Sequence, residues 1–142
     1  MTRVTFYSNV VDKQLILFDL VQAAIKKQHS VTVLSENKLV ASAISKGLWE
    51  TEKANFIPNV LASHPQVAQT AVVIGWEQKE LSQDDILINL IQAQPMLFSR
   101  FRQLIEIVGH DDEDKAAGRQ RFKFYRDRGY EIKHIDALTL KS

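Results

Sequence analysis

The residues with the clearest chemical potential lie near the end of the chain, where cations alternate with aromatic side chains. Residues 115–133 contain seven Lys and Arg against two acidic residues, a local charge of +5 in a chain whose formal net charge is +1. In a helix expected over 111–128, Gly118, Phe122 and Tyr125 recur at helical spacing and should face a sheet. The flank of that stripe carries Lys115, Arg119, Lys123 and Arg126.

This combination suits a particular class of ligand. Ammonium and guanidinium groups beside an apolar crevice can bind a molecule that has a carboxylate or phosphate together with a hydrophobic group. An interior Gly118 costs about 1 kcal/mol relative to Ala in a helix, so it indicates either a close packing partner at that position or simply a weak helix. The alternative is a solvated basic helix end that only complements the helix dipole.

A second group of large apolar residues falls in an irregular stretch over residues 50–70 and just before it. Side chains of this kind in a loop either plug the core or form an exposed patch, and aromatic residues anchor interfaces more often than most types. The sequence leaves both alternatives open. The group consists of Trp49, Phe56, Ile57 and Pro58.

The sequence offers little that could support catalysis or cofactor binding. The first expected strand is followed by Ser8-Asn9-Val10-Val11, and glycines occur only at 47, 75, 109, 118 and 129, so no phosphate-binding glycine turn can be written. There is no cysteine, and the four histidines have no metal-ligand spacing. The acidic run over 111–114 is typical of a helix start. We therefore expect no cofactor, no metal site and no enzymatic activity.

The apolar periodicity predicts a single α/β domain over residues 1–142. Continuous apolar strands that alternate with helices favour a three-layer, mainly parallel Rossmann-like sheet with helices on both faces and no nucleotide-binding glycine loop. Six strands are expected, over 3–7, 31–34, 71–76, 86–90, 103–108 and 130–135. Helices are expected over 12–28 with Asp12 as cap, from a Ser35 cap to a stop at Gly47, and over 111–128, with a single turn over 95–101.

Composition places the chain in a broad class. An apolar content of 45% and a charged content of 25% in 142 residues are typical of one globular domain. The start of the chain has no secretory signal pattern, and no apolar run approaches the roughly 18 residues of a membrane span. We expect a cytoplasmic protein that does not contact a membrane.

Several segments, taken in order, resemble the chi subunit of bacterial DNA polymerase III. The resemblance spans nearly the whole chain and depends on the ordered combination rather than on one sharp motif. The matching segments are Val4-Thr5-Phe6-Tyr7, Leu48-Trp49, Phe56-Ile57-Pro58, Ile86-Leu87-Ile88-Asn89-Leu90, Phe98-Ser99-Arg100-Phe101, Arg121-Phe122-Lys123-Phe124-Tyr125-Arg126 and Gly129-Tyr130.

The resemblance implies a non-catalytic accessory subunit of the clamp-loader complex that joins two other proteins during DNA replication and meets DNA only indirectly. One surface would bind the psi subunit, which links it to the clamp loader, through Trp49, Phe56, Ile57 and Pro58. The other would capture the acidic, Phe-ending C-terminal tail of single-stranded-DNA-binding protein. The residues implied for that tail site are Val108, Lys115, Arg119, Phe122 and Lys123.

Two other functions remain open from the residues alone. Lys and Arg beside aromatic rings also suit phosphates and stacked bases, so a direct single-stranded nucleic-acid-binding protein is one alternative. A small metal-dependent nuclease is another, because an acid-x-Lys pair occurs at Glu77/Lys79 and again at Glu131/Lys133.

Overall fold

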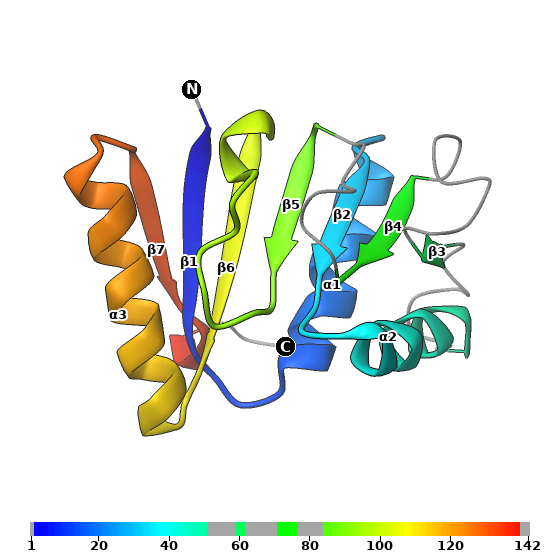
Figure 1. The fold of residues 1–142 in the computed structure, drawn as a ribbon. Coiled ribbons are helices and arrows are strands. Elements are labelled where there is room, and N and C mark those ends of the chain that lie inside the picture. The colour runs from blue at the N-terminus through cyan, green and yellow to red at the C-terminus, as the bar shows by residue number, and fades with distance from the viewer. Residues whose placement is uncertain (1, 51–58, 62–70, 77–83, 140–142) are drawn as a thin grey trace.

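The computed structural model describes residues 2–50, 59–61, 71–76 and 84–139. Its described strands form one seven-stranded sheet in the order β3-β4-β2-β5-β6-β1-β7, and every pairing between neighbours is parallel (Figure 1). The strands are β1 (Arg3–Val10), β2 (Val31–Leu34), β3 (Val60–Leu61), β4 (Val72–Gly75), β5 (Ile86–Asn89), β6 (Gln103–Gly109) and β7 (Ile132–Asp136). The helices are α1 (Lys13–Lys26), α2 (Lys38–Glu50) and α3 (Asp112–Asp127), with 3-10 turns η3 (Phe98–Arg100) and η4 (Ala137–Thr139).

Helices cover both faces of the sheet, as the sequence predicts. Side chains alternate along each strand, so one core lies under α1 and α2 and a second lies under α3 and η3. Figure 1 shows α1 passing behind the sheet at β2, whereas α3 runs alongside β7 and β1. The three-layer α/β fold is therefore confirmed. The large side chains of the α3 core are Phe6, Leu87, Phe98, Phe101, Leu104 and Tyr125.

The expected ends of the second helix were wrong. Ser35 does not cap it: the Ser35 hydroxyl donates to the Gly75 carbonyl at 3.2 Å, and Asn37 accepts the cap hydrogen bond from the Val40 N–H at 2.9 Å. Gly47 does not stop it either, because α2 continues to Glu50. A Cβ atom at Gly47 would lie 2.9 Å from Phe18 Cζ, so this glycine allows α1 and α2 to approach each other.

The remaining elements agree closely with the predicted ones. Asp12 caps α1 by accepting the Leu15 N–H at 3.1 Å. The strand that the sequence did not predict is β3, whose two residues lie in the stretch expected to be irregular. The first strand also runs three residues further than expected, to Val10.

That extension of β1 contains an irregularity. Tyr7 is opposite Ile107 on β6 but Val10 is opposite Gly109, so β1 holds one extra residue between the two pairs. Asn9 takes up the bulge with φ +57°, a left-handed conformation that Asn tolerates better than most residues. Ser8 and Asn9 thereby lie at the carboxyl end of the sheet beside α3.

Candidate functional site

Local signals fix both ends of α3 as predicted. Asp111 is its N-cap and accepts the Asp114 N–H at 2.7 Å, and Gly129 follows the last turn with φ +83°. The acidic run therefore has a structural role. Asp114 is buried, accepts the Gly109 N–H, and pairs with Lys13 Nζ at 2.8 Å. Burial alone would raise the pKa of Asp114, but these hydrogen bonds and the Lys13 charge hold it below its usual value.

Gly118 brings α3 very close to β6. A Cβ atom on Gly118 would lie 2.7 Å from Cγ2 and 2.9 Å from Cγ1 of Val108, which leaves no room for one. The close packing expected at Gly118 is confirmed, and its partner is a β-branched side chain on a central strand. The glycine therefore determines how far the cations of α3 stand from the sheet.

A buried polar network fixes how α3 is rotated about its axis. Glu106 on β6 has no exposed surface, and it accepts hydrogen bonds from Arg121 Nε at 2.9 Å, Tyr125 Oη at 2.6 Å and Asn89 Nδ2 at 2.8 Å. Arg121 also donates through Nη1 to the Gln92 carbonyl at 2.7 Å. Arg121 is therefore an internal cation rather than part of the surface charge that the sequence indicates.

The network shifts the pKa of its members. Burial raises the pKa of Glu106, and the Arg121 charge together with the three hydrogen bonds opposes that rise. Burial beside the Glu106 carboxylate also raises the pKa of Tyr125, which keeps its hydroxyl a hydrogen-bond donor. Because β6 and α3 are held together at this point, one side of α3 over residues 115–122 faces the ends of β1 and β7.

Those residues line an open cavity of about 490 Å³ between α3 and the sheet. Four of the five residues implied for the acidic-tail site meet there: Val108, Lys115, Arg119 and Phe122. The fifth, Lys123, is exposed on α3 and does not line the cavity. The other lining residues are Phe6, Ser8, Asn9, Gly118 and His134.

The floor of the cavity is apolar. The Phe6 and Phe122 rings meet edge to face with centroids 5.3 Å apart, and Phe6 also contacts Tyr125 at 6.0 Å. Val108 closes the floor beneath Gly118. The edge-to-face geometry is one that aromatic pairs favour, and an apolar floor of this kind suits a ring or an aliphatic group.

The rim of the cavity is cationic on the α3 side. Arg119 is exposed and forms no ion pair with any other residue that the structure describes, so its guanidinium can meet an incoming anion. Lys115 is partly buried and lies near enough to Asp136 to contribute to the lowered pKa of that carboxyl. The main cause of the lowered Asp136 pKa is the hydrogen bond from the Leu138 N–H, followed by that from Asn9.

The opposite wall is polar and comes from strand ends that the sequence did not single out. Ser8 Oγ lies 2.7 Å from His134 Nε2, and Asn9 Nδ2 donates to Asp136 Oδ1 at 3.2 Å. Parallel pairing of β1 with β7 sets Phe6 opposite His134. The expected first strand ended at residue 7, so Ser8, two residues after the inward Phe6, was not recognised as a wall residue.

The second predicted surface lies mostly outside the described residues. Trp49 is in the last turn of α2. Phe56, Ile57 and Pro58 fall in the range 51–58, which the structure does not describe. The assignment of these four residues to an interface therefore stays a prediction.

The described part of the chain contains no group of three or more His, Cys, Asp or Glu placed to hold a metal ion. Of the two acid-x-Lys pairs, Glu131 and Lys133 are exposed, and 77–79 lies outside the described residues. Within the described ranges, none of the helices has both the length and the apolar run needed to cross a bilayer.

The fold and the cavity define a Rossmann-like domain that lacks a phosphate-binding glycine turn and has a cation-rimmed apolar cavity at the end of its sheet. The family model described as "DNA polymerase III chi subunit, HolC" matches residues 1–133. The chain belongs to the DNA polymerase III chi subunit family, whose members are accessory subunits of the replicative polymerase.

Relatives from three bacteria share this name. The DNA polymerase III subunit chi of Haemophilus influenzae is 31% identical over 103 residues, which cover 72% of this chain and 72% of that protein. The Escherichia coli protein is 29% identical over 103 residues, which cover 72% of this chain and 70% of that protein. The Pseudomonas aeruginosa protein is 27% identical over 136 residues, which cover 93% and 94%.

The fold itself recurs in a protein of another kind. The C-terminal domain of S. cerevisiae Dbp5 superposes with a TM-score of 0.61 at 12% identity, covering 96% of this chain and 90% of that one. At this identity the likeness concerns the fold alone.

Proposed function

We propose that the chain joins the clamp loader to single-stranded-DNA-binding protein during replication, without catalysis of its own. In this proposal the cavity beside α3 captures the acidic, Phe-ending C-terminal tail of single-stranded-DNA-binding protein. The observation that carries the proposal is the meeting of Val108, Lys115, Arg119 and Phe122 around one open cavity. Membership of the chi family, from which these site residues were inferred, also supports the proposal.

The chemistry of the cavity matches the two parts of such a tail. The terminal ring would enter the space above Phe6, Val108 and Phe122, where its burial contributes most of the affinity. The terminal carboxylate and the acidic side chains would meet Lys115 and Arg119 at the rim. Exposed charge pairs contribute only about 0.2–1 kcal/mol each, so charge guides the tail while the ring and the terminal carboxylate give specificity.

Two matched substitutions on α3 test the tail site. Arg119→Ala removes a cation at the rim, and we expect it to weaken binding of a labelled acidic Phe-ending peptide about threefold to fivefold, as the upper part of the range for an exposed charge pair predicts. Lys123→Ala removes the same charge outside the cavity and should weaken binding less than about twofold. Fluorescence anisotropy titrations measure both.

The comparison controls for general electrostatic attraction, because both variants have the same net charge. Equal affinity of wild type and Arg119→Ala would contradict the site, as would equal losses in the two variants. A labelled single-stranded oligonucleotide is titrated alongside: strong, salt-dependent oligonucleotide binding with no peptide binding would favour the nucleic-acid alternative instead.

The second part of the proposal assigns Trp49, Phe56, Ile57 and Pro58 to the psi subunit. We expect Phe56→Ala to weaken psi binding at least tenfold in a pull-down or titration while the melting temperature stays within a few degrees, because an interface aromatic contributes little to the isolated fold. Arg119→Ala serves as the control and should bind psi normally. A large fall in melting temperature with unchanged psi binding would show that Phe56 belongs to the core.

A further inference from the structure

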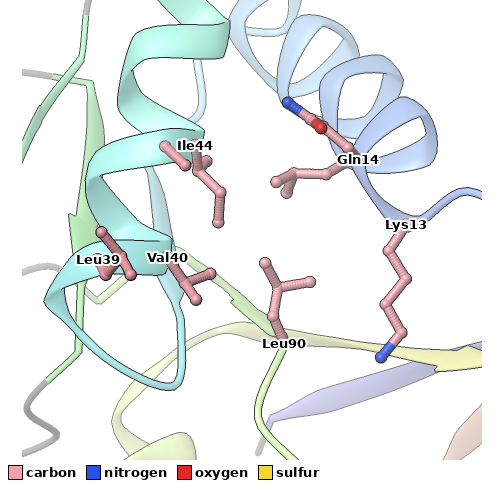
Figure 2. Close-up of a pocket in the computed structure, with 8 residues that line it drawn as sticks. Lys13, Gln14, Leu39, Val40, Ile44 and Leu90 are labelled. Atoms are coloured by element: carbon pink, nitrogen blue, oxygen red, sulfur yellow. The ribbon is translucent and has the colours of Figure 1, made fainter.

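A second cavity lies on the α1 and α2 face, at the carboxyl ends of β2 and β5. It has a volume of about 390 Å³ and is lined almost entirely by carbon. Figure 2 shows Val40 and Ile44 on α2 facing Leu90, with Lys13 and Gln14 across from them on α1. We call this cavity the α1–α2 notch. Crevices outside the carboxyl ends of parallel strands are common ligand sites in α/β folds.

The mouth of the notch exposes apolar side chains that the fold does not need there. Leu39 is 80% exposed and Val40 is 40% exposed, both in the first turn of α2. Polar residues would satisfy a solvated helix start equally well. Large exposed aliphatic groups around an apolar cavity are typical of a surface that another molecule covers.

An acidic hollow of about 410 Å³ adjoins the notch and shares Lys13 and Leu90 with it. Its carboxylates are Glu36, Asp111, Glu113 and Asp114. Lys13 Nζ is 2.8 Å from Asp114 Oδ2, so that pair is neutral and three carboxylates remain. The Gln92 N–H donates to Glu36 Oε1 at 3.0 Å and holds that carboxylate at the rim.

The α1–α2 notch and the acidic hollow adjoin each other, so one ligand can occupy both. An aliphatic group fits the notch, and a cation fits the acidic hollow beside it, so a ligand needs both within a few residues of chain. We propose that this face docks a short basic segment of another protein, with a Leu-like side chain in the α1–α2 notch and a Lys or Arg over Glu36 and Glu113. The acidic rim repels an acidic tail, which keeps the two sites of the molecule selective for opposite charges.

Defined peptides test this inference directly. The probe is a fluorescein-labelled, C-amidated heptapeptide with two Leu and four Lys or Arg residues, compared with versions in which Leu is replaced by Ala or the basic residues by Glu. Anisotropy titrations against the full chain should show binding of the first peptide that weakens with salt. Each altered peptide should bind at least tenfold more weakly.

Matched variants locate the binding. Leu39→Lys places a cation at the mouth of the notch and should weaken the basic peptide about tenfold, whereas Leu15→Lys, at a 44% exposed leucine of α1 that does not line the notch, should weaken it less than twofold. Glu113→Gln should weaken it about threefold, and Asp112→Asn, one residue away and outside the hollow, should leave it unchanged.

Three results would overturn the inference: no binding of the basic peptide at millimolar concentration, equal losses within each matched pair, or equal binding of the Glu-containing peptide. Melting temperatures of the variants verify that they fold. The inference does not depend on the tail site, because Leu39→Lys should bind the acidic Phe-ending peptide with wild-type affinity. A negative result at one site therefore does not contradict the proposal for the other.

Discussion

Replacing Glu106 by Ala is expected to lower the free energy of unfolding by about 3–5 kcal/mol, the range found when one partner of a buried ion pair is removed. The substitution leaves the Arg121 guanidinium, which is 3% exposed, without its counter-charge. It also removes the acceptor of the Tyr125 hydroxyl and of the Asn89 amide. Urea unfolding followed by circular dichroism measures the loss.

Arg121→Met is the companion variant, and its effect on the free energy of unfolding should depend on pH. Without the guanidinium, the pKa of buried Glu106 rises further above its ordinary value of 4.5. A carboxyl whose pKa is higher in the folded state favours folding in its protonated form, so stability is retained below about pH 4.5 and is lost as the pH rises through the raised value. Because the same loss begins in wild type once the pH exceeds 4.5, the deficit of Arg121→Met relative to wild type should grow only above the raised pKa that Glu106 has in wild type.

A loss below about 1 kcal/mol for Glu106→Ala, or a deficit of Arg121→Met that does not change with pH, would contradict this account of the network. Because the network holds α3 against β6, Glu106→Ala should also weaken peptide binding in the adjacent cavity. Measurement at a temperature where the variant is still folded separates that effect from unfolding.

Gly118→Ala is expected to destabilise the protein by about 1–2 kcal/mol, although Ala is the better helix former by about 1 kcal/mol. The new Cβ would lie 2.7 Å from Val108 Cγ2, and a β-branched side chain in a strand has little freedom to turn away. The helix must move outward, which alters the cavity that both residues line. Thermal or urea unfolding gives the sign of the change.

A double-mutant cycle isolates the clash. Val108→Ala removes the two methyl groups that the new Cβ would meet, so Gly118→Ala should cost much less in that background than in wild type. Additive losses would show that the destabilisation has another origin. A stabilising Gly118→Ala would show that helix propensity outweighs packing at this position.

The sequence predicted the elements whose signals are local. Asp111, the acids after it and Gly129 delimit α3 because a cap, a dipole and a left-handed residue act within a few positions of the helix end. The helix end predicted at Gly47 was wrong because the role of this glycine depends on Phe18 in another helix, which no local pattern reveals. A glycine that permits helix contact and one that ends a helix look alike in sequence.

The buried network shows the same limit. Glu106 stands within an apolar strand, and its partners Asn89, Arg121 and Tyr125 are 17, 15 and 19 positions away. Helical periodicity puts both Tyr125 and Arg121, four residues before it, on the face of α3 toward the sheet, but no local pattern identified the buried carboxylate that pairs with Arg121. Only the packing of α3 on β6 brings the carboxylate and guanidinium together.

The α3 side of the candidate tail site could be predicted from the sequence, whereas the side formed by the strands could not. Helical spacing placed Phe122 beside the cations of α3, and the resemblance to the chi family added Val108. Ser8 and His134 could not be assigned, because their meeting depends on the parallel register of β1 with β7. The side of the cavity formed by one helix is visible in sequence, whereas the side formed by two distant strands is not.

The extra residue in β1 makes chain length a diagnostic for homologous proteins. Between Phe6 and Val10, β1 contains one more residue than the stretch of β6 that pairs with it, and Asn9 is the residue at this bulge. A homologue shorter by one residue here could keep all seven strands in order while its polar wall vanished. The number of residues between these two apolar positions would therefore distinguish relatives that retain the cavity beside α3 from relatives in which it is closed.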